Sequence, residues 1–355
     1  MEELIPSLPY DVALNCLARL PRFYHSTLSQ VSNPIRSLLS SPFFYEAHSA
    51  LHGEQTMLYF SVNYPESNDL HWFMINLDDP DPLLRLPLIP SLTFRPSTMC
   101  AQINHDIYVL GGYTGDALSP EVWILDCRFN RWRQGPSMHI PRDKGKVTVL
   151  DRKIYLFDGE VLGQQQSGSG ILGEVLDTVV GSWEVIMILE GADGSPLITS
   201  DLIFNKMKEA SRKIVSPPAG LGNWPTWMNR VLYSYVDGPS PTILAHELTQ
   251  DGTWVQKIVK GSYCLVPPGM NPVMAKTRSA AARELFLLWL CHRSMKPPEV
   301  NEDFANICCL KIEIKRSQDG QLYAIACDGG LSYQFYSSSF ITDGCSIQQC
   351  FALQI

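Results

Sequence analysis

The sequence lacks the residue spacings that usually indicate a zinc site, an exported protein or a membrane segment. None of the ten cysteines forms a C-x-x-C pair, and no Asn-x-Ser/Thr glycosylation sequon occurs. The start, Met1-Glu2-Glu3, has neither the basic residues nor the apolar core of a signal peptide, and the longest apolar run, Leu285 to Cys291, is too short to span a bilayer. These absences favour an intracellular protein, in the cytoplasm or the nucleus, whose thiols are reduced and buried.

Basic charge and catalytic motifs are scarce as well. The formal net charge of −8 argues against a nucleic-acid surface, which needs a basic face. His246-Glu247 begins no H-E-x-x-H zinc motif because Gln250 occupies the second histidine position, and no G-x-S-x-G elbow is present. Gly168 to Gly173 fits G-x-G-x-x-G, but a polar run precedes it and a strand-like run follows, so a loop is favoured over a dinucleotide site. We therefore expect a protein that is not an enzyme and holds no metal or cofactor.

The first fifty residues show a helical pattern that the rest of the chain lacks. Pro9 suits a first helical position, Asp11 suits the first turn, and Pro21 ends the segment. Two apolar series follow at helical spacing: Val12, Cys16, Leu17 and Leu20, and then Leu28, Val31, Ile35, Leu38 and Leu39. Because so small a unit cannot bury both series by itself, the pattern predicts an exposed apolar groove for a partner.

Residues 2 to 48 resemble the F-box, a short helical module that docks on a Skp-type adaptor in cullin–RING ubiquitin ligases. The resemblance is carried by Leu4-Ile5, Leu8-Pro9, Asp11, Cys16-Leu17, Leu20-Pro21, Leu28, Val31-Ser32, Ile35-Arg36, Leu38-Leu39 and Ser41-Pro42. It implies that the adaptor is contacted by Leu4, Ile5, Leu8, Pro9, Val12, Cys16, Leu17, Leu20, Pro21, Leu28 and Val31. The alternative interpretation is a helical cap packed on the following domain.

One segment departs from the F-box pattern. Asn33-Pro34-Ile35 stands where the family usually has a lysine or arginine and an aromatic residue. Pro34 is expected to push Asn33 out of helical geometry, so that the helix through Val31 breaks and restarts there. The sequence leaves open whether this departure weakens adaptor binding.

From residue 57 onward, short β-type runs replace the helical period, and one unit repeats. The runs Ile107 to Gly112, Glu121 to Asp126 and Asn130 to Trp132 recur in the same order as Lys153 to Gly159, Glu174 to Asp177 and Gly181 to Trp183. Tyr108 and Tyr155 are 47 residues apart, and Trp132 and Trp183 are 51 residues apart. A period of about 50 residues with four short strands is typical of a kelch blade. Residues 97 to 187 thus look like the kelch family, and the pairing with an F-box resembles plant-type F-box/kelch-repeat proteins.

The resemblance implies a mainly β fold, in which a kelch-type β-propeller over residues 55–355 follows the small all-α F-box. We expect five or six blades, with six favoured, paired glycines where the backbone runs close to its neighbours, and a Trp wedged between adjacent blades. The first blade lacks its leading strand and residues 350–355 form a spare one, so the last strand is expected to close the ring. Residues 188–228 fit no clean blade and suggest an insertion or a degenerate blade, in which Ser200 to Ile214 could form a helix.

Together the two resemblances imply a substrate receptor of an SCF-type cullin–RING ligase, with a Skp-type adaptor and a target protein as partners and with catalysis on other subunits. The alternative is a kelch interaction scaffold with a vestigial F-box. A copper oxidase on a kelch propeller is disfavoured because the eight histidines show no paired spacing. Target contacts are expected on the long loops at 112–121, 159–173, 188–228 and 292–306, with Tyr113, Trp224, Trp227 and Arg293 as candidates.

Overall fold

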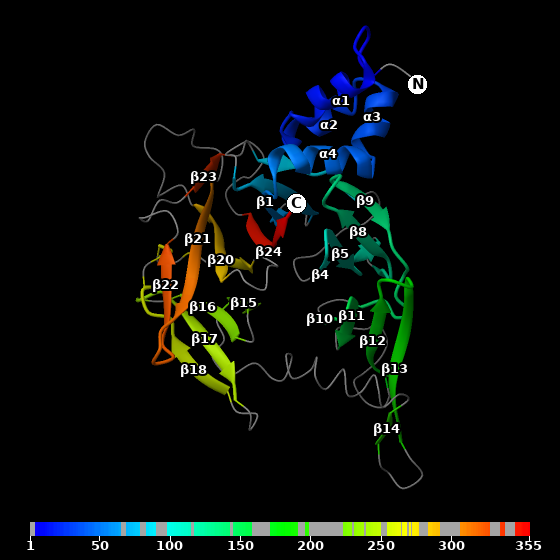
Figure 1. The fold of residues 1–355 in the computed structure, drawn as a ribbon. Helices are drawn as coiled ribbons and strands as arrows, with labels where there is room; N and C mark the ends of the chain where they lie inside the picture. The colour runs from blue at the N-terminus through cyan, green and yellow to red at the C-terminus, as the bar shows by residue number, and fades with distance from the viewer. Residues whose placement is uncertain are drawn as a thin grey trace.

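Helices occupy only the first part of the chain, and strands form the remainder of the described structure (Figure 1). The computed structural model describes residues 4–64, 69–78, 83–89, 98–114, 117–142, 145–157, 171–190, 196–198, 223–228, 231–237, 239–249, 254–263, 265–267, 270, 272–276, 283–291, 306–326, 334–337 and 345–355. The helical module, residues 4–53, lies at one end of the molecule beside β1 and β9, and the sheets are arranged around a centre (Figure 1). The predicted mainly β fold with a small helical start is confirmed.

The helical module consists of four short α-helices and one 3-10 turn: α1 (Tyr10–Ala18), η1 (Arg22–Tyr24), α2 (His25–Leu28), α3 (Asn33–Leu39) and α4 (Pro42–His52). Pro9 directly precedes α1 as its N-cap, one position before the helical position that the sequence suggested. Ser41 caps α4, since its hydroxyl accepts a hydrogen bond of 3.2 Å from the Phe44 N–H. The buried core of the module consists of Leu4, Ala13, Leu14, Leu17, Ala18, Ile35, Leu38, Leu39 and Phe44.

The prediction for the Asn33-Pro34 segment is half right. The helix does break before it, because α2 ends at Leu28 and α3 begins at Asn33. Asn33 itself is helical, however, and the extended residue is Ser32, whose hydroxyl accepts the Ile35 N–H at 3.3 Å. Pro34 lies in the first turn of α3, where its missing N–H leaves no helical hydrogen bond unmade. Pro34 therefore starts a helix here instead of disturbing its neighbour.

The described part of the propeller contains five sheets of four or five strands, which we number as blades in chain order. Blade 1 runs β24 (Ser346–Gln354), β1 (Thr56–Tyr64), β2 (Asp69–Asn76) and β3 (Leu84–Arg85). Blade 2 runs β4 (Met99–Ile103), β5 (Asp106–Leu110), β8 (Val122–Asp126) and β9 (Arg131–Gln134), with a small hairpin of β6 (Tyr113–Thr114) and β7 (Ala117–Leu118) between β5 and β8.

The remaining blades have the same antiparallel order. Blade 3 runs β10 (Lys146–Leu150), β11 (Lys153–Phe157), β12 (Ile171–Asp177), β13 (Ser182–Glu190) and β14 (Pro196–Ile198). Blade 4 runs β15 (Asn223–Met228), β16 (Val231–Val236), β17 (Thr242–Leu248) and β18 (Trp254–Ile258). Blade 5 runs β19 (Val273–Lys276), β20 (Glu284–Cys291), β21 (Asn306–Arg316) and β22 (Leu322–Ala326), while β23 (Gln334–Ser337) also pairs with β21.

The described residues thus form five blades, the lower of the two counts that the sequence allowed. The irregular region at 188–228 contains the end of β13 and all of β14, which belong to blade 3. Its last residues form β15, which begins blade 4. The expected helix from Ser200 to Ile214 lies outside the described residues.

The last strand closes the first blade, as predicted. β24 pairs antiparallel with β1 from Thr56 opposite Gln354 to Asn63 opposite Ser346. The pairing continues past the strand ends, because Gln55 and Ile355 exchange two backbone hydrogen bonds of 3.0 and 2.9 Å. Blade 1 is therefore built from residues at both ends of the propeller region.

Buried apolar clusters join neighbouring blades. Separate clusters connect blades 1 and 5, blades 4 and 5, blades 1 and 2, and blades 2 and 3. The indole N–H of Trp132 in blade 2 donates to the Pro87 carbonyl at 2.8 Å, and that of Trp183 in blade 3 donates to the Pro136 carbonyl at 2.7 Å. Each Trp thus bonds to the segment that ends the preceding blade, which confirms the predicted wedge.

The first glycine of the repeat also has its predicted role. Gly111 follows β5 with a φ of +74°. A Cβ atom at this position would lie 2.6 Å from the Arg142 carbonyl oxygen, which is far closer than a carbon atom can approach. The backbone of blade 2 can therefore contact this neighbouring segment only with glycine here.

Candidate adaptor-binding surface and target face

Helix α1 has apolar residues on two sides. One side faces the core of the helical module and contains Ala13, Leu14, Leu17 and Ala18. On the other side Val12 is 45% exposed, and Cys16, one turn later, is also exposed. Leu8 before the helix and Leu20 after it are each 36% exposed. We call Leu8, Val12, Cys16 and Leu20 the outward stripe; because the inward side already fills the core, the stripe is available to another protein.

The residues that the F-box resemblance implies for adaptor contact differ in their exposure to solvent. Pro9 and Val31 are exposed like the outward stripe, and Ile5, Pro21 and Leu28 are half-buried. Leu4 and Leu17 are 7% and 4% exposed and belong to the core of the module, so in this conformation they support the surface from beneath.

Three further exposed apolar residues of the module were missed from the sequence: Tyr24, Phe43 and Leu51. Phe43 is 54% exposed, whereas the adjacent Phe44 is 2% exposed in the core. A signal for Phe43 did exist, because consecutive helical residues point in different directions and α4 can direct only one of the two rings into the core.

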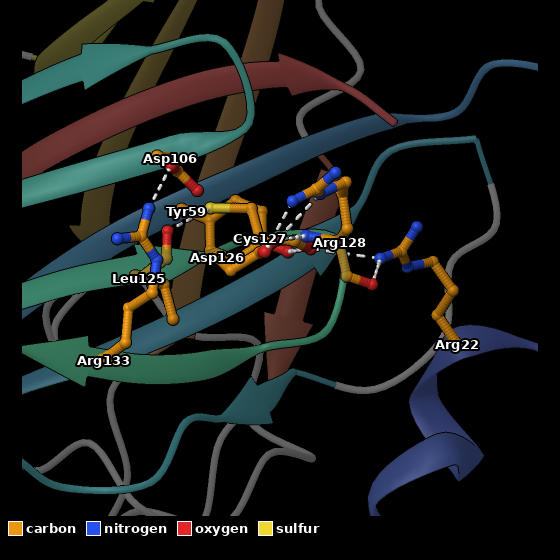
Figure 2. A network of polar contacts seen from close by, with 8 residues as sticks. All are labelled: Arg22, Tyr59, Asp106, Leu125, Asp126, Cys127, Arg128 and Arg133. Atoms are coloured by element: carbon orange, nitrogen blue, oxygen red, sulfur yellow. Dashed lines mark hydrogen bonds and ion pairs between the residues drawn. The ribbon is translucent and has the colours of Figure 1, made fainter. Parts of the chain in front are cut away.

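The module is attached to the propeller through Arg22 (Figure 2). This side chain is 5% exposed, and its Nη2 donates to the carbonyl oxygens of Cys127, at 3.1 Å, and of Arg128, in the turn after β8. Its guanidinium also lies 5.9 Å from the centre of the Tyr45 ring of α4. The sequence reasoning missed Arg22 altogether.

The turn that receives Arg22 is held by further polar contacts (Figure 2). The Tyr59 hydroxyl lies 2.8 Å from the Cys127 carbonyl and 2.7 Å from Asn130 Oδ1, and it can donate to either. Arg128 forms a two-point ion pair with Asp126, with its closest N–O distance at 2.7 Å. Burial raises the pKa of the Tyr59 hydroxyl and of the Cys127 thiol, so both groups stay protonated at neutral pH.

Three histidines cluster inside the helical module. The ring centres of His25 and His48 are 5.1 Å apart, and those of His48 and His52 are 4.3 Å apart. Burial, the adjacent His48 and the Arg22 guanidinium lower the pKa of His25 to about 3. Burial and Arg22 lower the pKa of His48 to about 4. Both rings are therefore neutral at physiological pH and act as packing groups.

The structure supports the predicted target contacts less well. Tyr113 lies in the β6–β7 hairpin and is 9% exposed, so its ring offers little surface to a target in this conformation, and its role as an anchor stays a prediction. Trp224 and Trp227 lie in strand β15 and not in a loop, and their side chains are outside the described structure. Arg293 lies outside the described residues.

Within the ranges that the structure describes, no three His, Cys, Asp or Glu side chains are arranged to hold a metal ion. In the same ranges, no helix has the length and apolar character needed to cross a membrane. The side chains of seven cysteines are described, all as free thiols, and five of them are buried: Cys127, Cys308, Cys309, Cys345 and Cys350.

Two family models match the chain, one in each of its parts. The F-box domain model matches residues 5–47, which coincide with the helical module. The model described as "FKB95, Kelch-repeats domain" matches residues 74–218, from blade 1 to the approach to blade 4.

Several Arabidopsis thaliana proteins named F-box/kelch-repeat protein are similar to this chain. One is 34% identical over 196 residues, which are 51% of this chain and 48% of that protein. Another is 34% identical over 206 residues, 54% of this chain and 53% of its own length. A third is 33% identical over 194 residues, 53% of this chain and 71% of its own length. The chain spans about half the length of most of these relatives. With a helical module, kelch blades and these matches in agreement, the chain belongs to the plant-type F-box/kelch-repeat proteins, and its helical module is the F-box.

Proposed function

We propose that this chain is a substrate receptor of an SCF-type cullin–RING ubiquitin ligase. In this role the F-box docks on a Skp-type adaptor, and the propeller binds the protein that is to be ubiquitinated. The chain itself catalyses nothing; it supplies proximity and orientation, while other subunits carry out the transfer. The assembly places the protein inside the cell, in the cytoplasm or the nucleus.

The observation that carries this proposal is the outward stripe. Val12 and Cys16 are exposed on α1 although Leu14 and Leu17 of the same helix already fill the core. Apolar side chains that the fold does not need cost free energy in water, at about 25 cal/mol for each Å² that a partner would cover. Their presence at regular helical spacing is explained by a partner that covers them.

A charge placed in the outward stripe tests the proposal. Val12→Glu puts a carboxylate in the first turn of α1, where the helix tolerates negative charge, so the F-box should stay folded. Burial of that carboxylate against an apolar partner costs free energy, so the affinity for a purified Skp-type adaptor should fall at least about 10-fold, which is ~1.4 kcal/mol of binding free energy. Calorimetry measures this affinity.

Val179→Glu is the matched control. Val179 is 71% exposed in the turn between β12 and β13 of the propeller, so the same substitution there should leave adaptor affinity unchanged. Equal affinity of wild type and Val12→Glu would contradict the assignment of the stripe. Absence of binding by the wild-type chain would favour the kelch scaffold with a vestigial F-box.

We place the target on the propeller loops, mainly at 159–173 and 188–228, because blade geometry does not account for their length. Support comes from blade 3, where β13 continues past its partner β12 and pairs with β14, with Ile188 opposite Ile198. This extension lies at the far end of the molecule from the F-box helices (Figure 1). A target held there would not compete with the adaptor for space.

The structure assigns Ile171 to Gly173 to β12, so the test of the target site replaces only residues 159–170 by a Gly-Ser turn. Proteins captured with the proteasome blocked should include a set that binds the full-length chain and is lost from the shortened one. Identical sets from both would show that the loop is only a connector.

A further inference from the structure

The connection between the F-box and the propeller is short and tied down. α4 ends at His52 and β1 begins at Thr56, so only three residues separate the two domains. The last of them, Gln55, exchanges two backbone hydrogen bonds with Ile355. A linker of this length, paired along part of it, allows little independent motion of the domains.

Arg22 is a second point of attachment, far from the first in sequence. It reaches from η1 to two consecutive carbonyl oxygens, those of Cys127 and Arg128, with which it forms hydrogen bonds (Figure 2). Both bonds come from one nitrogen, Nη2, and the planar guanidinium also lies over the Tyr45 ring. Tyr45 itself packs against His105 and Phe129 of blade 2. Together with the linker, these contacts oppose the rotation that a single linker would permit.

The buried charge of Arg22 makes the position of the F-box on blade 2 important. A cation that is 5% exposed is costly to bury unless its donors are used, and here the acceptors are neutral carbonyl groups instead of a carboxylate. Asp126, the nearest acid along the turn, is already paired with Arg128. In this orientation the two carbonyl oxygens replace part of the water that would solvate Arg22 in a detached F-box, whereas Nε is buried without a hydrogen-bond partner. A shift of the F-box on blade 2 that broke these two bonds without admitting water would leave the buried cation with no acceptor.

We propose that Arg22 is a positioning residue that fixes the direction of the F-box relative to the propeller. The proposal rests on the proposed ligase function for its purpose: a target on the propeller would be presented to the ligase in one orientation. The outward stripe consists of two residues of α1 and two that flank it, and the buried Arg22 is not among them, so Arg22 acts on the geometry of the assembly and not on adaptor affinity.

Fluorescence energy transfer within the full-length chain tests this role. Donor and acceptor dyes are attached through non-natural amino acids at the exposed Ser37 of α3 and at the exposed Val180 in blade 3. The wild type should give one narrow distance distribution. Arg22→Ala should lose it and give a broad distribution. Arg22→Lys should broaden it as well, because an ammonium is not planar and does not stack on Tyr45 as the guanidinium does. The matched control, Arg19→Ala, changes an exposed arginine three residues away and should behave like the wild type.

Adaptor affinity separates the possible outcomes. Unchanged affinity in a variant with a broad distribution shows that the F-box is folded and has lost only its orientation. If Arg22→Ala loses adaptor binding through misfolding, Arg22→Lys decides the question. Narrow distributions in the folded variants would overturn the positioning role. Absence of adaptor binding by the wild type would overturn the proposed function and leave the distance result standing.

Discussion

The F-box and the propeller treat their apolar residues differently. Within residues 4–53, seven large apolar side chains are exposed: Leu8, Val12, Leu20, Tyr24, Val31, Phe43 and Leu51. The described part of the propeller is several times longer and also exposes seven: Leu88, Val179, Val180, Val255, Ile258, Tyr263 and Ile325. Adjacent blades share their buried clusters, whereas a helical unit of about fifty residues has too little interior to enclose its own apolar residues. The four described joints between blades therefore enclose apolar residues on both sides, whereas the F-box leaves a large share of its apolar residues exposed, as a partner-binding surface would.

The largest expected effect comes from removing the strand that closes blade 1. Removal of residues 348–355 takes most of β24 from blade 1, including the buried Ala352, Leu353 and Ile355. We expect the cooperative thermal transition of the propeller to disappear in circular dichroism while the F-box retains adaptor binding. A chain with the exposed Ser346 changed to alanine should melt like the wild type. An unchanged melting curve after truncation would contradict closure through β24.

The next prediction compares a buried ring and an exposed ring of the F-box. Phe44→Ala removes a ring from the core and should lower the free energy of unfolding of the F-box by about 3–5 kcal/mol in urea titrations. Phe43→Ala removes the same ring from the surface and should change it by less than about 0.5 kcal/mol. Equal costs at both positions would remove the distinction between core and partner surface.

Each pH unit of acidification should weaken the F-box by less than Phe44→Ala does. Both His25 and His48 have folded-state pKa values, about 3 and about 4, below their ordinary value of 6.5. Below about pH 6.5 the unfolded chain binds protons that the folded F-box excludes, so the free energy of unfolding falls as the pH drops toward 4, by up to about 1.4 kcal/mol per pH unit for each histidine. Denaturant titrations across this range measure the slope. The double variant with glutamine at both positions should show a flatter dependence, and an equally steep one would exclude these histidines as the cause.

The smallest effect concerns the contacts between blades. Trp132→Phe deletes the hydrogen bond to the Pro87 carbonyl and should cost about 1 kcal/mol of propeller stability. Trp183→Phe deletes the equivalent bond to Pro136 and should cost a similar amount. Adaptor affinity should not change in either variant. An unchanged melting temperature in both variants would mean that these two hydrogen bonds do not stabilise the contacts between neighbouring blades.

Local patterns in the sequence were sufficient for most of the fold. The Trp132 and Trp183 spacing and the β-type runs around them predicted blades 2 and 3, and the spare strand at 350–355 predicted the closure of blade 1. These features depend on turn chemistry and on strand period, which a few neighbouring residues determine. The sequence predicted the orientation of α1 less well. Val12 and Leu17 belong to one predicted series, yet Val12 is exposed and Leu17 is buried on the opposite side of the helix. The choice is made by α3 and α4, and small buried residues such as Ala13 give a weak signal.

The joint between the domains could not be predicted at all. The acceptors of Arg22 lie 105 and 106 residues away, and both are backbone carbonyls, which every residue possesses. No residue type at Cys127 or Arg128 therefore reveals the contact. The burial of Tyr113 was hidden for a related reason, because a short hairpin can turn an aromatic ring toward the protein or toward solvent without any change in its sequence pattern.

The pairing of β24 with β1 also sets the order in which the molecule is completed during synthesis. The F-box uses contacts that are close in sequence, so it can fold soon after it leaves the ribosome. β1 follows it directly, but β24 emerges roughly 15–60 s later at about 5–20 residues per second. During this interval one edge of β1 has no partner strand. Under the proposed function, a nascent chain would recruit its adaptor before it is able to hold a target, and an adaptor bound early would accompany the unfinished propeller until its ring closes.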